Sequence, residues 1–241
     1  MYLILISVTA AVLAGVAVFL VGGGWFLTGL AAIVAFLLSQ LIIGRRLRKR
    51  LEPAMQQVRR QVEAGMLRQA VDTLDSLLPL GAWIPLLRPQ LHAQIGVLAN
   101  HLGDRERAMR HLLLASRRSP EAQLLLAALH ERAGNLDLMR KSLLRAAPYQ
   151  KKSPLFHNVH AWLLDRHGDA RDAIARLHKF IQKHGDDASR DNLNRLENGK
   201  KMNMKAFGFA WFALGYERPP QSMGQVQTAR KGFRQPPKSK R

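Results

Sequence analysis

Residues 89–121 read PQLHAQIGVLANHLGDRERAMRHLLLASRRSPE and decide the fold. Apolar residues recur at helical spacing on both sides of the pair Gly103-Asp104. Glycine readily takes the left-handed conformation that ends a helix, and aspartate is a preferred N-cap. The stretch therefore predicts two antiparallel helices, from about Pro89 to His101 and from Asp104 to Arg117, joined by a tight turn.

This turn recurs along the chain. Four glycines follow apolar helical patterns at intervals of 38, 31 and 34 residues, and three of them precede Asp or Asn. A small or slender residue stands five positions after each glycine. Repetition at this period is typical of a solenoid of helical hairpins, so the predicted fold class is all-α. The glycines and the residues five positions later are Gly65 and Ala70, Gly103 and Ala108, Gly134 and Met139, and Gly168 and Ala173.

Two of the copies carry a family pattern. The first consists of Gly96, Ala99, Gly103, Asp104, Ala108, Leu112, Ala115 and Pro120, and the second of Ala161, Leu164, Gly168, Asp169, Ala173, Leu177 and Phe180. Both resemble the tetratricopeptide repeat. The second departs from it at Gly185, where proline is usual, and the copies around Gly65 and Gly134 keep less of it. The resemblance covers about Leu51 to Asp187, and it implies fold far more than function.

The resemblance also implies a binding surface. In this family the first helix of each hairpin lines a concave groove that holds an extended peptide or a partner helix. For Trp162, the alternatives are an anchor for a ligand and packing against the capping helix, and packing is favoured. By position, the groove candidates are Gln90, Gln94, Val97, Asn100, His101, Glu131, Asn158, Trp162 and Asp165.

The N-terminus predicts a membrane anchor. Residues 1–44 contain no charged side chain: an apolar run from Met1 to Val21, three glycines and a second run from Trp25 to Ile43. Each run has the length of a span, so residues 1–44 are expected to form a two-span hairpin. A cleaved signal peptide is the less favoured alternative, because a basic n-region is missing and a second span follows.

The positive charges orient this hairpin. Of the net charge of +20, residues 45–50 (RRLRKR) supply +5, residues 198–241 supply +9, and residues 51–197 the remaining +6. Basic clusters stay on the cytoplasmic side, so both termini are expected there, in an integral protein of a bacterial inner membrane. In the predicted linker 45–52, the side chains expected to face anionic lipid are Arg45, Arg46, Arg48, Lys49 and Arg50.

The rest of the chain divides by composition. Residues 53–199 are expected to form the solenoid, with a short helical turn between Pro79 and Pro89 and a capping helix from Asp187 to Glu197. Residues 200–220 are rich in aromatic side chains, and we weigh an interfacial anchor, a broken fifth repeat and packing on the solenoid, the last being favoured. Residues 221–241 are expected to be a disordered basic tail that meets lipid, solvent or, less favoured, RNA.

Catalytic chemistry finds little support in the sequence. There is no cysteine, and Gly22 to Gly24 lie between apolar runs rather than in a phosphate loop. His157 and His160, one helical turn apart, could ligate a metal with His184, Asp165 or His167, although packing histidines are the favoured interpretation. We therefore expect no enzyme and no cofactor.

The expected function is a membrane-anchored scaffold. Its groove would bind a protein that acts at the cytoplasmic face of the membrane, for example in envelope assembly or transport. The alternative is a membrane-tethered contact with nucleic acid or the ribosome through the basic tail.

Overall fold

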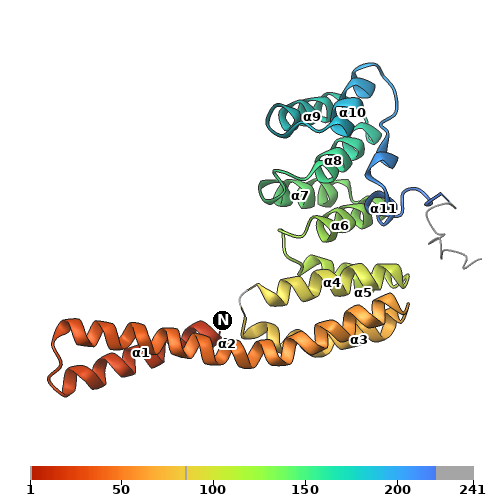
Figure 1. Cartoon of the computed structure of the whole chain (residues 1–241). Coiled ribbons are helices and arrows are strands. Elements are labelled where there is room, and N and C mark those ends of the chain that lie inside the picture. The colour runs from red at the N-terminus through yellow and green to blue at the C-terminus, as the bar shows by residue number, and fades with distance from the viewer. Residues whose placement is uncertain (1, 85, 221–241) are drawn as a thin grey trace, which may run out of the picture. The chain divides into compact units, whose positions relative to one another are not determined.

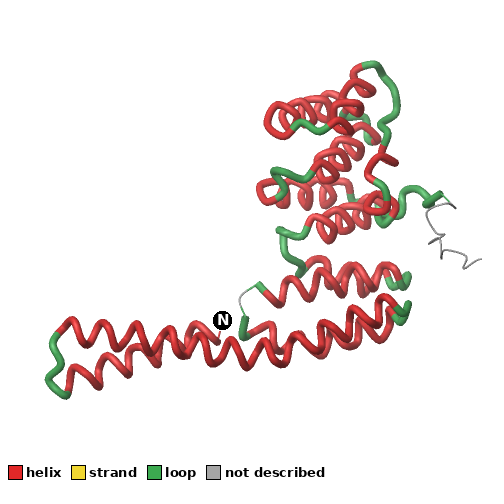
Figure 2. Tube along the Cα trace, viewed as in Figure 1, coloured by secondary structure: helices red, strands yellow, loops and turns green. Residues whose placement is uncertain are grey.

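A computed structural model describes residues 2–84 and 86–220, and the tail expected to be disordered, 221–241, lies outside this range. The protein is all-helical, with 79% helix and no strand among the described residues (Figure 1, Figure 2). The helices form two compact units, Met1–Ser153 and Pro154–Arg241. Each unit is described by itself.

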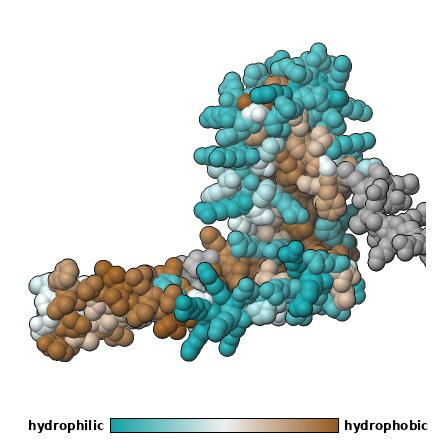
Figure 3. Space-filling view, in the orientation of Figure 1, coloured by the Kyte–Doolittle hydropathy of each residue, from teal (hydrophilic) through white to brown (hydrophobic). Residues whose placement is uncertain are grey.

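The first unit begins with two long apolar helices, α1 (Tyr2–Leu20) and α2 (Trp25–Glu63). Both are long and apolar enough to cross a membrane, since 19 residues at 1.5 Å each span about 28 Å. They pack through small residues: a Cβ on Gly15 would lie 3.6 Å from the Cβ of Ala32. Such small-residue contacts let membrane helices approach closely. Figure 3 shows a hydrophobic surface over α1 and the start of α2.

Helix α2 continues well beyond its apolar part. It runs for 39 residues without a break, through the basic cluster to Glu63. The predicted linker 45–52 is therefore helical, and Pro53 lies inside α2. A proline there removes one backbone hydrogen bond. Tertiary packing offsets this loss, since the turns after Pro53 carry the buried Val58.

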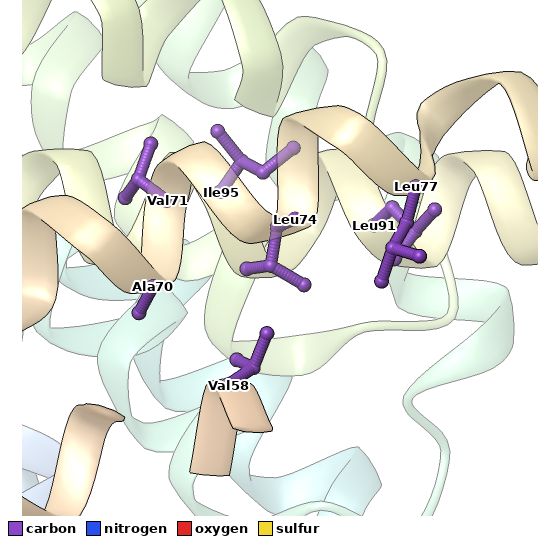
Figure 4. Packing of buried hydrophobic residues seen from close by; sticks show 7 residues of the cluster. All are labelled: Val58, Ala70, Val71, Leu74, Leu77, Leu91 and Ile95. Atoms are coloured by element: carbon purple, nitrogen blue, oxygen red, sulfur yellow. The ribbon is translucent and has the colours of Figure 1, made fainter. Parts of the chain in front are cut away.

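The end of α2 belongs to the first hydrophobic core. It packs with α3 (Leu67–Leu77) and α4 (Leu87–His101). The buried side chains point toward one another from the three helices (Figure 4). The first part of α2 is one arm of the apolar hairpin, and its last turns belong to this core. The hairpin and the core therefore share one continuous helix. The core residues are Val58, Ala70, Val71, Leu74, Leu77, Leu91 and Ile95.

Antiparallel helix pairs make up the rest of the two units. In the first unit α4 packs with α5 (Arg105–Leu113), and α6 (Pro120–Arg132) with α7 (Leu136–Ala146). In the second unit α8 (Pro154–Arg166) packs with α9 (Ala170–His184). The 3-10 turn η1 (Leu78–Ala82) confirms the short helical turn expected before α4, and a second turn, η2 (Ala147–Tyr149), follows α7.

The turn glycines confirm the left-handed helix ends. Gly65, Gly103, Gly134 and Gly168 have φ between 75° and 89°. At Gly103, the glycine N–H donates to the Asn100 carbonyl and the next N–H to the Ala99 carbonyl, both at 3.0 Å, which is the Schellman arrangement. Asp104 caps α5 by accepting from the Arg107 N–H at 3.0 Å, whereas Asn135 makes no such cap bond. The residues five positions after the glycines are buried at Ala70, Ala108, Met139 and Ala173.

Helix α5 ends earlier than predicted, at Leu113 instead of Arg117. The Ser116 N–H donates to the Pro89 carbonyl at 3.1 Å, and the Ser116 hydroxyl accepts from the Arg118 N–H at 3.2 Å. These bonds hold a turn, not a helix. The bond from Ser116 ties the chain after α5 back to the start of α4, the other helix of the same pair.

The second unit ends in shorter elements. Helix α10 (Asp187–Glu197) has the bounds predicted for the capping helix and packs on α9 and α8. It is followed by η3 (Met204–Phe207) and the single turn α11 (Phe209–Phe212). These last two elements lie within the aromatic segment 200–220, and Trp211 and Phe212 are buried.

Candidate partner-binding groove

A groove of about 400 Å³ opens in the first unit between the end of α2, α4 and the start of α6. Its walls are mostly apolar, and Leu74 of α3 lies at its base among the buried core residues. The polar groups lie around the mouth. The lining residues are Met55, Val58, Arg59, Val62, Glu63, Leu74, Ala93, Gln94, Val97, Leu98, Ser119 and Glu121.

Helical spacing explains why these side chains meet. Met55, Val58 and Val62 are three and four residues apart, so they lie on one face of α2. Gln94, Val97 and Leu98 do the same on α4, and the side chain of Val97 is only half-buried. The two apolar stripes face each other above Leu74 of α3 and leave a concave surface.

Charges frame the mouth of the groove. Arg59 Nε lies 2.9 Å from Glu63 Oε1 one turn along α2, and both side chains are exposed. Glu121 stands in the first turn of α6. The mouth therefore carries one cation and two carboxylates around an apolar floor, a pattern that suits an apolar segment flanked by polar or basic residues.

The structure places only some of the predicted groove residues here. Gln94 and Val97 line the groove. Gln90 and His101 lie exposed elsewhere on α4, and Asn100 is half-buried outside the lining. Glu131 and Asp165 are half-buried in the last turns of α6 and α8. The regular spacing of the repeat thus points to α4, which borders this groove, but only Gln94 and Val97 of its predicted residues lie in the lining.

The α2 wall was missed by sequence reasoning. The copy around Gly65 keeps little of the family pattern, so its first helix contributed no candidates. The signal that could have found the wall is the i, i+4 pair Arg59–Glu63 beside Met55, Val58 and Val62, which marks the border between a solvated and an apolar face.

Asn158 corrects the predicted set, because it is not open to a partner. Its side chain is fully buried. The amide nitrogen donates to Ser189 Oγ at 2.6 Å and to the Pro154 carbonyl at 2.9 Å, and the amide oxygen accepts from Asn192 Nδ2 at 2.9 Å. Asn192 Oδ1 in turn accepts from the Asn203 N–H at 2.6 Å. This buried network links α8 to α10 and to the segment that follows.

Trp162 is covered by the chain itself. Its ring lies 5.0 Å from the ring of Trp211 and 4.7 Å from that of Tyr216, and the Arg166 guanidinium lies 5.1 Å from its centroid. Trp211 and Tyr216 stack at 5.4 Å. The sequence favoured packing against the capping helix, but the rings that Trp162 meets come from the aromatic segment.

The histidine pair has the surroundings of packing residues. His157 stacks on Phe180 with centroids 4.4 Å apart, and His160 is buried beside the edge of Phe156. Burial, and then the positive charges of Arg176 and His157, lower the pKa of His160 to about 3. A neighbouring guanidinium also disfavours a metal cation. Within the described residues no group of three or more His, Asp or Glu side chains could hold a metal ion.

A polar contact joins the first helix pairs away from the groove. Arg107 of α5 forms an ion pair with Asp75 of α3 and lies 3.6 Å from Asp72. Nearby, the Nδ1 atoms of His92 and His111 lie 3.1 Å apart, so one ring must donate to the other. Burial lowers the pKa of both histidines, and positively charged neighbours act in the same direction, whereas the Asp75 carboxylate opposes the shift. These groups lock α3, α4 and α5 together.

The comparisons with known proteins give no relative. No protein-family model matches the chain, and neither a curated protein nor a solved structure matches it.

Proposed function

We propose that this protein is a membrane-anchored, tetratricopeptide-repeat-like scaffold that binds a protein segment in the groove between α2, α4 and α6. The observation that carries the proposal is the open apolar groove itself. Its floor is formed by side chains of three helices, and its mouth is charged. Such a surface offers apolar area and a charged border to a ligand.

The second unit supplies a precedent for the ligand. Val97 and Trp162 each stand six residues before a turn glycine, Gly103 and Gly168. Val97 borders the open groove, whereas Trp162 carries the rings of Trp211 and Tyr216. The equivalent position in this chain therefore accepts a short aromatic segment. We infer that the partner presents a helical or extended stretch with one or two large apolar side chains.

The proposed membrane anchor would increase the binding of partners that lie in the same membrane. The two apolar spans, α1 and the first part of α2, would hold the groove close to the bilayer, because α2 continues without a break into the groove wall. A partner in the same membrane then meets the groove at a raised effective concentration. Under these conditions, a low affinity of the groove for the partner is sufficient for binding. The cytoplasmic orientation follows from the basic cluster and is part of the proposal.

A photo-crosslinking amino acid tests the groove in membranes. It replaces Val97 in the full-length chain, and Leu144, an exposed residue of α7 outside the lining, serves as the matched control position. We expect a discrete protein adduct at position 97 that disappears when Val62→Asp is added and persists when Leu113→Asp is added. Equal adducts at positions 97 and 144, or adducts insensitive to Val62→Asp, would contradict the proposal.

The alternative of a nucleic-acid or ribosome contact depends on residues 221–241, which lie outside the described residues. It stays a prediction from composition, and nuclease treatment before crosslinking separates it from the scaffold.

A further inference from the structure

The segment between α3 and α4 is unusually apolar for a connection. From Leu77 to Leu87 the chain has no charged or hydrogen-bonding side chain apart from the indole of Trp83. Trp83 and Leu86 are exposed large hydrophobic residues, and Leu86 is 55% exposed. A connection in water normally carries polar side chains. In this connection, the helix pairs of the first unit leave the apolar side chains of Trp83 and Leu86 exposed.

The same segment lies beside the beginning of α1. The ring of Trp83 lies 5.7 Å from the ring of Tyr2, the first described residue of the chain. Figure 1 shows the N-terminal end of α1 next to the connection between α3 and α4. Since Tyr2 opens the first apolar helix, Trp83 lies at the level where the candidate spans begin.

The basic cluster of α2 lies at that level too. Helix α1 and the apolar part of α2, Trp25 to Ile43, each contain 19 residues. They are antiparallel across a short turn, so the first arginine, Arg45, lies near the level of Tyr2. Arg45, Arg46, Arg48, Lys49 and Arg50 are all exposed. One level of the first unit thus combines aromatic rings, apolar side chains and five cations.

Several residues on both sides of position 85 pack closely on their surroundings. A Cβ on Gly81 would lie 2.7 Å from the Cβ of Arg88, so the two ends of the connection approach closely. Leu78, Leu80 and Leu87 pack against the first core. Leu86 has φ of 67°, a left-handed conformation that is costly for a leucine, and its side chain is exposed. A strained backbone at Leu86 therefore coincides with an outward-facing apolar side chain.

We propose that Trp83, Ile84 and Leu86 form an interfacial foot that inserts into the headgroup layer of the membrane, next to anionic lipid phosphates bound by the α2 cations. Indole and tyrosine rings prefer this layer, and basic side chains beside it are attracted to anionic headgroups. The foot is a second membrane contact besides the spans. It fixes the angle at which α2 leaves the bilayer and hence the height of the groove. The inference rests on the proposed membrane anchoring.

Single-cysteine spin labels test the foot, because the natural chain has no cysteine. The full-length variant Leu86→Cys is reconstituted in vesicles of phosphatidylcholine and phosphatidylglycerol. Collision of the label with oxygen and with a polar nickel complex then reports its depth. Leu13→Cys, 70% exposed on α1, is the control for the span, and Leu144→Cys, 58% exposed on α7, is the control for water.

We expect the Leu86 label to lie between the two controls, at headgroup depth, with nickel accessibility at least about threefold below that of position 144. Adding Trp83→Ser should move it toward water, and neutral vesicles should have a smaller effect in the same direction. A label at position 86 as accessible as that at 144, with position 13 inside the bilayer, would overturn the foot alone. Position 13 in water would instead overturn the membrane anchoring.

Discussion

Each unit contains a first helix of an antiparallel pair, α4 or α8, and the equivalent faces of these two helices differ in whether they are covered. In the first unit the face of α4 that bears Val97 is open and borders a groove of about 400 Å³. In the second unit the face of α8 that bears Trp162 is covered by Trp211 and Tyr216, and Asn158 on the same helix is sealed in a hydrogen-bond network. The same local architecture is therefore open in one unit and covered in the other.

The difference follows from what the chain provides to each face. The second unit has a segment after its capping helix, Met204 to Tyr216, that contains the required rings. Gly208 allows this segment to turn, with φ of 58° and ψ of −139°, a conformation open to glycine alone among common residues. The first unit has no such segment of its own among the described residues. Its face remains available to another chain.

The largest expected effect comes from uncovering the closed face. Trp211 is fully buried, so Trp211→Ala should cost about 3–5 kcal/mol of unfolding free energy through lost burial and a cavity. Denaturant titration of the full-length protein in detergent, monitored by circular dichroism, measures this loss. Phe209→Ala in the same helix turn is the matched control, because that ring is 72% exposed, and it should cost below about 1 kcal/mol. Equal losses would mean that Trp211 does not close the face.

The buried amide network is expected to make the next largest contribution to stability. Asn192→Ala leaves the Asn203 N–H and the Asn158 amide oxygen without a bond, which should cost about 2–3 kcal/mol. The same titration measures it, and Asn194→Ala on the exposed side of α10 is the control. If the two alanine variants unfold alike, the network does not hold the end of the second unit.

Acid should weaken the second unit through His160. Its pKa is about 3 in the folded protein and 6.5 when exposed, so the unfolded state binds the proton first as the pH falls. Its stability contribution is complete above about pH 6.5 and is lost below it, by about 2 kcal/mol between about pH 7 and pH 5. Comparing denaturant midpoints of the natural protein and His160→Phe at both pH values isolates the effect.

The control for acid is His101→Gln, since His101 lies exposed on α4. The natural protein and His101→Gln should lose stability equally between the two pH values, while His160→Phe should lose distinctly less. If His160→Phe loses as much stability between the two pH values as the natural protein, the group whose titration weakens the fold is not His160.

Much of the fold was accessible from sequence because it depends on local chemistry. The turn glycines and Asp104 identify the helix ends, and the bounds of α10 were predicted to the residue. The path of α2 was not, because proline at position 53 suggests a helix start, whereas packing on both sides keeps one helix running through it. Local preferences cannot report such tertiary compensation.

The candidate site was only half accessible for a related reason. Spacing from the turn glycine gives the helix face, so Gln94 and Val97 were found. Whether a face is open depends on segments far away in sequence. Asn158 and Trp162 have the spacing of groove residues, and they are covered by side chains that follow at least 31 residues later in the chain. The covering residues are Ser189, Asn192, Trp211 and Tyr216.

The smallest stability effect is expected at the open face, and there it should come with the largest loss of binding. Val97 is already half in solvent, so Val97→Asp should change the unfolding free energy by no more than about 1 kcal/mol. The carboxylate would nevertheless stand in the apolar wall and add to Glu63 and Glu121. A partner that buries an apolar anchor there would have to desolvate that charge, so crosslinking from a second groove position, Val62, should fall at least about tenfold.

Leu144→Asp, at an exposed position of α7 outside the groove, is the control and should leave crosslinking unchanged. The comparison between the two faces then depends on how Val97→Asp fails. Loss of the adduct with the first unit still folded means that the face of α4 is used for binding. If Val97→Asp instead destabilises the first unit as strongly as Trp211→Ala is expected to destabilise the second, both faces are structural, and the groove is a packing gap and not a binding site.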